Sequence, residues 1–84
     1  MNERRADSSA GDETLKKLRM ALGWSSNELA RRAKIDGSTV RSAERGFLIS
    51  APSARAIAQA LSAAYGREIR PDELHLRLGP SSQQ

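Results

Sequence analysis

Cysteine is absent from this 84-residue chain, and histidine, tryptophan, tyrosine and phenylalanine each occur once. Without cysteine the chain has no disulfide framework and no thiolate ligand for zinc. The carboxylates nearest to His75 are Asp72 and Glu73, and we expect this histidine at the surface or in an interface rather than on a metal. With a single histidine, the many serines lack a partner base. These absences predict that the protein is not an enzyme and binds no metal or cofactor.

Long apolar runs are also missing. No segment approaches the roughly 20 apolar residues that a helix needs to cross a bilayer. The opening residues, MNERRADSSAGD, are too polar and acidic for a secretory signal. We therefore expect no membrane partner and a cytoplasmic location.

Basic charge is the main excess in the composition. The formal net charge is +4, and residues 14–46 carry eight basic against three acidic side chains. Such a surface attracts the polyanionic backbone of nucleic acid, with an affinity that falls as salt is added. The same charges would serve equally to keep a small domain in solution, so charge alone leaves the partner open.

Apolar residues recur at helical spacing along most of the chain, and no segment has the alternation of a strand. This pattern predicts an all-α domain at residues 12–78, between a flexible arm at residues 1–11 and a flexible tail at residues 79–84. Five helices are expected: residues 12–22, 26–33, 37–45 and 53–65, and a short helix from Pro71 with its apolar stripe on Leu74 and Leu78.

The segment from Ser25 to Gly46 has the features of two short helices joined by a tight corner. Ser25 is a cap residue, and Glu28 three positions later completes a capping box. Asp36 is expected to cap the second helix with its side chain, and Gly46 to end it. Two helices joined by about three or four residues are typical of a helix-turn-helix.

Residues 14–78 resemble the phage-repressor and Cro type of helix-turn-helix proteins, the XRE-like family of bacterial and phage regulators. Besides the segment above, the resemblance rests on LKKLR, on ERG at the end of the second helix of the motif, and on PSARAIAQAL followed by PDEL. It implies a compact five-helix bundle of the lambda-repressor-like type, and a sequence-specific regulator of transcription such as a repressor. The partner it implies is double-stranded DNA, and the location is therefore expected to be nucleoid-associated.

Three positions depart from the family pattern. The family often has glutamine, glycine and a larger aliphatic residue where this chain has Ser26, Lys34 and Ala43. Ser26 can still donate to a phosphate, but with less reach than glutamine. Lys34 is expected at a corner position that usually has a positive φ, where glycine is favoured, so the lysine either takes a modest strain there or adopts a slightly different corner.

In proteins of this type, the second helix of the motif lies in the major groove and the first crosses the DNA backbone. The resemblance therefore implies base contacts from Gly37, Ser38, Arg41 and Ser42. Arg41 is the main candidate among them, because its planar fork can pair with O6 and N7 of guanine. The residues expected at phosphates are Ser26, Asn27, Lys34, Thr39 and Arg45.

Arg19 and Glu44 match positions where relatives often hold a buried ion pair between the first and third helices. We interpret this pair as part of the architecture rather than of the readout. Deletion of one partner is expected to leave the other charge buried without a partner and to unfold the domain.

A chain of this length can bury only a thin core, so association with a second copy would add stability. The resemblance implies a homodimer on an inverted-repeat operator, with half-site centres about 34 Å apart. The self-contact is expected at the fifth helix and its approach, on Ile69, Leu74, Leu76 and Leu78.

A second interpretation stays open on the sequence. A protein-binding module, such as an antiactivator or an antitoxin, would use the same scaffold to bind and inhibit a regulatory protein partner. Residues 37–45 favour it, because they lack the glutamine and asparagine that commonly read adenine and have Gly37 where a reading side chain would be useful.

Overall fold

The structure is a computed structural model that describes residues 14–79. The predicted arm at residues 1–11 and residues 80–84 of the predicted tail lie outside the described residues. The described part contains a first helix at residues 14–21, α2 (Ser26–Ala33), α3 (Gly37–Glu44), α4 (Ala51–Tyr65) and the 3-10 turn η1 (Pro71–Leu74). The prediction of an all-α class is confirmed for this part of the chain.

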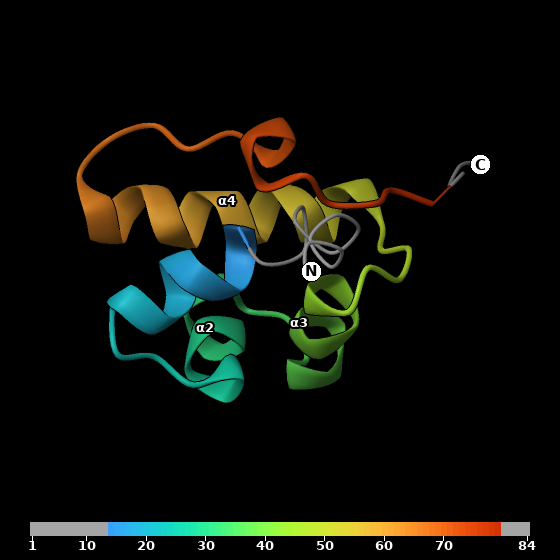
Figure 1. Cartoon of the computed structure of the whole chain (residues 1–84), viewed down its shortest axis with the longest axis horizontal. Coiled ribbons are helices and arrows are strands. Elements are labelled where there is room, and N and C mark those ends of the chain that lie inside the picture. Colours follow the sequence, from blue (N-terminus) through green and yellow to red (C-terminus); the bar gives the residue numbers. More distant parts are fainter. Residues whose placement is uncertain (1–13, 80–84) are drawn as a thin grey trace, which may run out of the picture.

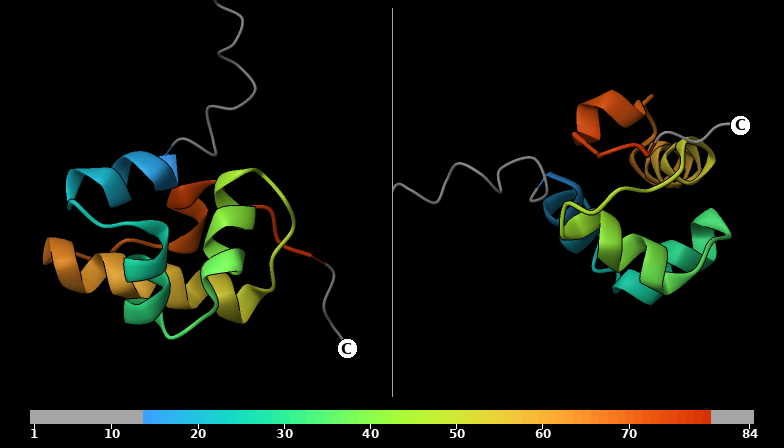
Figure 2. Two further views of the ribbon diagram at one scale, coloured as in Figure 1. Left: turned by 90° about the horizontal axis from the view of Figure 1, so that it is seen from below. Right: turned by 90° about the vertical axis from the view of Figure 1, so that its right-hand side faces the viewer.

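α4 is the central element of the fold. Figure 1 shows the first helix, α2 and α3 on one side of α4, and η1 on the other. The right-hand view of Figure 2, which looks nearly along α4, shows the same layering. Because α4 is covered from both sides, its buried residues make the middle of the core. The largest side chains fully buried in that core are Leu15, Leu29, Val40, Ile57, Leu61 and Leu74.

α4 begins two residues before the predicted start. Ser50 is its cap residue, and the Ser50 side chain accepts a hydrogen bond from the N–H of Ser53 at 3.2 Å. Pro52 lies within the first turn, where a missing N–H costs nothing. The helix ends at Gly66, which has a φ of 71°, as expected for a residue that closes a helix in the left-handed conformation.

The prediction of a fifth α-helix is wrong, and residues 14–79 hold four α-helices and one 3-10 turn. The turn stops after four residues because His75 takes a left-handed conformation with a φ of 57°. Leu78 then pairs with Ile49 in an isolated parallel bridge, so the chain beyond η1 is extended. The four-residue spacing of Leu74 and Leu78 is therefore not that of a helical stripe.

Two side-chain hydrogen bonds attach the C-terminal end of α4 to its neighbours. The hydroxyl of Tyr65 donates to the carbonyl of Leu18 at 2.8 Å, which joins α4 to the first helix. The hydroxyl of Ser62 accepts from the N–H of Ile69 at 2.7 Å and fixes the loop that leads to η1. Within residues 14–79, no helix has both the length and the apolar character needed to pass through a membrane.

Candidate nucleic-acid interface

α2 and α3 form the two-helix unit predicted from the sequence. Ala30 and Val40 are buried, and the small side chain of Ala30 is on the face of α2 that turns toward the core. The N–H of Ile35 donates to the carbonyl of Ala30 at 2.9 Å and closes the corner. Lys34 has a φ of 64°, the left-handed conformation expected at this position. Figure 2 (left) shows α2 and α3 beside each other at one face of the molecule.

The two helices of the motif are capped differently. The Ser25 side chain accepts from the N–H of Glu28 at 3.0 Å, which is half of the predicted capping box. The carboxylate of Glu28 does not return to Ser25 and instead pairs with Arg32 at 2.8 Å. Asp36 occupies the cap position of α3, but its side chain makes no capping hydrogen bond. The prediction of a side-chain cap from Asp36 is therefore wrong, and the first turn of α3 has donors left for another acceptor.

The residues expected at base edges lie at the start of α3. Ser38 and Arg41 are exposed, whereas Gly37 and Ser42 are half-buried. Ser42 faces a small polar hollow of about 240 Å³ that Ser38 and Thr39 also line, together with Ser50 and Ser53 at the start of α4. Ser42 is thus less accessible from the outer face of α3 than Arg41.

The residues expected at phosphates surround this face. Asn27 and Ser26 are at the start of α2, Lys34 is in the corner, and Arg45 directly follows α3. Lys34 and Arg45 are exposed, and neither is in an ion pair among the described residues. A cation without an internal partner keeps its full charge for a phosphate.

The two basic residues of α2 are engaged within the protein. Arg31 and Arg32 both pair with Glu28, at 3.7 Å and 2.8 Å. The Arg32 guanidinium also stacks over the ring of Trp24, 4.5 Å from its centroid. These contacts hold both arginines on the helix surface and favour the interpretation that they are not part of the interface.

One contact at this face was not expected from the sequence. The Nη1 of Arg41 donates to the Oδ1 of Asn27 at 3.3 Å, so the predicted base reader and a predicted phosphate contact touch each other. Gly37 lies between them, and a Cβ built on it would be 2.3 Å from that same Oδ1. The only signal in the sequence was a glycine at the start of a helix, which does not identify a neighbour on another helix.

Arg19 and Glu44 form an ion pair with two hydrogen bonds. The Nε and Nη2 of Arg19 donate to the two carboxylate oxygens of Glu44 at 2.6 and 3.0 Å. The Nη1 of Arg19 donates to the carbonyl of Trp24 at 2.8 Å. Both charged side chains are only 11% exposed. The pair therefore joins the first helix, the following loop and the end of α3.

The four residues expected in a self-contact are separated by the fold. Ile69 and Leu74 are 3% and 0% exposed, so they belong to the core and have no surface to offer a second copy. Leu76 is half-buried, and Leu78 is 48% exposed. Phe47 and Leu48 were not among the residues expected in the self-contact, and both are exposed in the loop after α3. The bridge between Ile49 and Leu78 brings this loop beside the C-terminal segment. We call Phe47, Leu48 and Leu78 the apolar loop patch.

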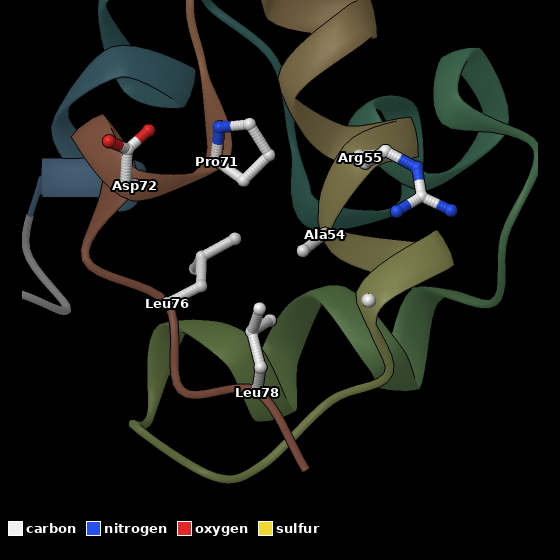
Figure 3. Close-up of a pocket in the computed structure, with 7 residues that line it drawn as sticks. Ala54, Arg55, Pro71, Asp72, Leu76 and Leu78 are labelled. Atoms are coloured by element: carbon white, nitrogen blue, oxygen red, sulfur yellow. The ribbon is translucent and has the colours of Figure 1, made fainter. Parts of the chain in front are cut away.

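An apolar hollow of about 400 Å³ lies on the other side of α4 from the motif. In Figure 3, Leu76 and Leu78 project from the C-terminal segment toward Ala54 of α4, and Pro71 closes the upper side. Arg55 and Asp72 lie at opposite edges of the hollow. Its walls offer apolar surface with a charge of each sign at the rim.

A helix-turn-helix family model matches residues 15–71, which is more than half of the chain. No match was found among curated proteins or among solved structures. The matched residues include the first helix, α2, α3 and α4, and therefore cover the motif, its corner and the Arg19–Glu44 pair that supports it. The chain thus belongs to the XRE-type helix-turn-helix family, and it is a DNA-binding helix-turn-helix regulator.

Proposed function

We propose that the protein is a sequence-specific regulator of transcription that binds double-stranded DNA as a symmetric homodimer, with α3 in the major groove. The exposed face at the start of α3 carries this proposal. Arg41 has no carboxylate partner among the described residues. Its remaining donors are free to form the paired hydrogen bonds to O6 and N7 of guanine that arginine commonly makes.

The charges around this face support the same orientation. Lys34 and Arg45 flank α3 at its two ends, and the start of α2 presents backbone N–H groups beside Ser26 and Asn27. Backbone donors at a helix start and unpaired cations are the groups that hold phosphates on either side of a groove. Base contact from α3 and phosphate contact from its neighbours are therefore compatible in one pose.

A dimer is proposed because a single domain of this size has few contacts to offer one DNA half-site. The apolar loop patch follows α3 directly in the chain, so a two-fold axis there would bring two α3 helices to one face of the duplex. The operator is then an inverted repeat with half-site centres about 34 Å apart. Of the residues expected in the self-contact, Leu76 and Leu78 keep this role in the proposal.

The experiment is selection from a pool of randomised duplex DNA at moderate salt, followed by affinity measurements over a range of salt concentrations. The wild-type protein should enrich one sequence, and its affinity should fall steeply with salt. Arg41→Ala should lose roughly 5- to 150-fold of its preference for that sequence. Arg67→Ala, an equal change of charge in the loop after α4, should leave the preference unchanged. Enrichment of no sequence by the wild-type protein would overturn the proposal.

A protein-binding module, of the antiactivator or antitoxin kind, is the second candidate. The apolar hollow between α4 and the C-terminal segment favours it, because such a surface fits an apolar side chain of a regulatory protein partner. α3 also presents few side chains that read bases. Under this alternative, the protein retains no DNA at moderate salt, and Arg41→Ala changes nothing.

A further inference from the structure

Asn27 is placed where it acts on another side chain rather than on a phosphate alone. It is exposed in the first turn of α2, and its Oδ1 accepts from the Nη1 of Arg41, a residue of α3. Arginine has only donors, so this bond fixes which end of the Asn27 amide faces Arg41. The amide nitrogen of Asn27, with its two donors, is turned away from Arg41.

Gly37 makes this contact geometrically feasible. A Cβ at this position would lie 2.3 Å from the Oδ1 of Asn27 and 3.2 Å from the Nη1 of Arg41. The first distance is far below any real contact of a Cβ. Gly37 is not among the glycines with positive φ, so the backbone does not require glycine here. The reason for glycine is therefore the space that the Asn27 amide occupies.

We propose that Asn27 is a positioning residue that holds Arg41 toward a guanine in the major groove. We also propose that Gly37, which has no Cβ, leaves the space that the Asn27 side chain needs for this contact. The proposal rests on the proposed function above. It gives Asn27 and Gly37 roles that differ from those expected from the sequence, which were a phosphate contact and a base contact. Specificity at one base pair then depends on three residues from two helices.

The chemistry of the contact fits this role. The guanidinium of arginine has five N–H donors, and the bond to Asn27 leaves enough of them for the two that guanine accepts. An exposed arginine loses several rotamers when it binds, and a contact that already restricts it lowers that cost. An aspartate at position 27 would hold Arg41 by charge, but it would also repel phosphates. The neutral amide of Asn27 holds the side chain without that repulsion.

The probe is the duplex enriched from the randomised pool, with each base pair replaced in turn. Asn27→Ala should lower discrimination at one G·C pair by about two- to tenfold, and this pair should be the one that Arg41→Ala affects. The slope of affinity against salt should not change, because no cation is removed. Ser26→Ala is the matched control at the neighbouring position. As the loss of a phosphate contact, it should weaken binding to all duplexes alike.

Gly37→Ala tests whether the contact of Asn27 with Arg41 needs the space left by the missing Cβ of Gly37. The atom that a Cβ meets is the free end of the Asn27 side chain, so the domain should remain folded, and alanine is the better helix former. The variant should keep or raise its melting temperature and should lose discrimination at the same G·C pair. In the double variant Asn27→Ala/Gly37→Ala, the change at Gly37 should cause no further loss of discrimination, because the Asn27 amide that the new Cβ would displace is absent.

The outcomes separate this proposal from the proposed function. If the wild-type protein enriches a sequence and the Asn27→Ala and Gly37→Ala variants discriminate at every base pair as the wild type does, the positioning role is wrong and the DNA-binding role stands. Equal weakening on every duplex by Asn27→Ala also overturns it, because that is the behaviour of a phosphate contact. Additive losses in the double variant would show that Gly37 acts without Asn27. If the wild-type protein enriches nothing, the proposed function itself fails.

Discussion

Lys34 holds the corner of the motif in a conformation that favours glycine. With a φ of 64°, its Cβ is close to the following carbonyl, a strain of roughly 1–2 kcal/mol for a residue with a side chain. The side chain is exposed and has no ion-pair partner in the described part of the chain. A lysine at this point therefore lowers the stability of the corner while adding a free charge beside the proposed interface.

Lys34→Gly should raise the free energy of unfolding by about 0.5–1 kcal/mol, since part of the relieved strain is offset by the greater freedom of glycine in the unfolded chain. It should also weaken DNA binding on all sequences. The slope of the logarithm of affinity against the logarithm of salt concentration should be smaller by about one. Thermal or denaturant unfolding and salt titrations measure the two effects.

The control is Lys34→Ala, which removes the same charge but keeps the strained conformation. It should bind DNA as weakly as Lys34→Gly without the gain in stability. A glycine variant no more stable than the alanine variant would show that the corner is not strained by its side chain.

At the scale of the elements, α3 is held by an ion pair rather than by packing alone. Arg19 on the first helix donates twice to Glu44, the last residue of α3, and both side chains are largely buried. Val40 and Ala43 are the buried apolar residues of α3, and they provide little area. The orientation of α3 therefore depends strongly on the charged pair.

Glu44→Ala should cost roughly 3–5 kcal/mol in the free energy of unfolding, because Arg19 would keep its charge in a buried site with one partner left, the carbonyl of Trp24. For a domain of this size, such a loss is comparable to the whole stability. Chemical denaturation followed by circular dichroism gives the value.

Glu28→Ala is the matched control, since it also removes a glutamate that pairs with arginines, but on the surface of α2. It should cost about 1 kcal/mol or less. Equal losses in the two variants would contradict the structural role of the Arg19–Glu44 pair.

At the scale of the whole molecule, the proposed homodimer needs a surface on which two copies meet. Ile69 and Leu74 are used by the core, so we assign the self-contact to the exposed patch of Phe47, Leu48 and Leu78, with the half-buried Leu76 beside it. The parallel bridge to Ile49 fixes Leu78 beside the loop that follows α3. The patch therefore lies beside the loop that follows α3, a position from which the proposed dimer would set the spacing of two half-sites.

Leu78→Asp should weaken self-association by roughly tenfold to a hundredfold, because each copy would lose a buried leucine from the interface. Binding to an inverted repeat should fall to the level of a single half-site, while the fold stays intact. Sedimentation velocity and binding to full and half operators measure these effects.

Met20→Asp is the control for this change, because Met20 is also exposed, at 57% against 48% for Leu78, but lies on the first helix, outside the patch. It should leave both the association and the operator binding unchanged. A Leu78→Asp protein that still dimerises on an inverted repeat would place the interface elsewhere.

Much of the fold followed from local rules in the sequence. α2 begins and ends where its cap and apolar spacing predict, and α3 is one residue shorter than predicted, whereas the left-handed corner at Lys34 was implied only by the resemblance to the family. The bounds of the two helices depend on residues within a few positions of one another. Local spacing and capping are enough to determine them.

The tertiary structure decided the rest. Leu74 and Leu78 share a helical spacing, yet a bridge to Ile49, almost thirty residues earlier in the chain, holds Leu78 extended and leaves a single turn at η1. The cap expected from Asp36 does not form, although its position is right. The contact of Asn27 with Arg41 over Gly37 joins α2 and α3, and the Arg19–Glu44 pair joins α3 to the first helix. Local pattern thus determined where the helices lie, whereas packing between distant segments determined which of their side chains are free to bind.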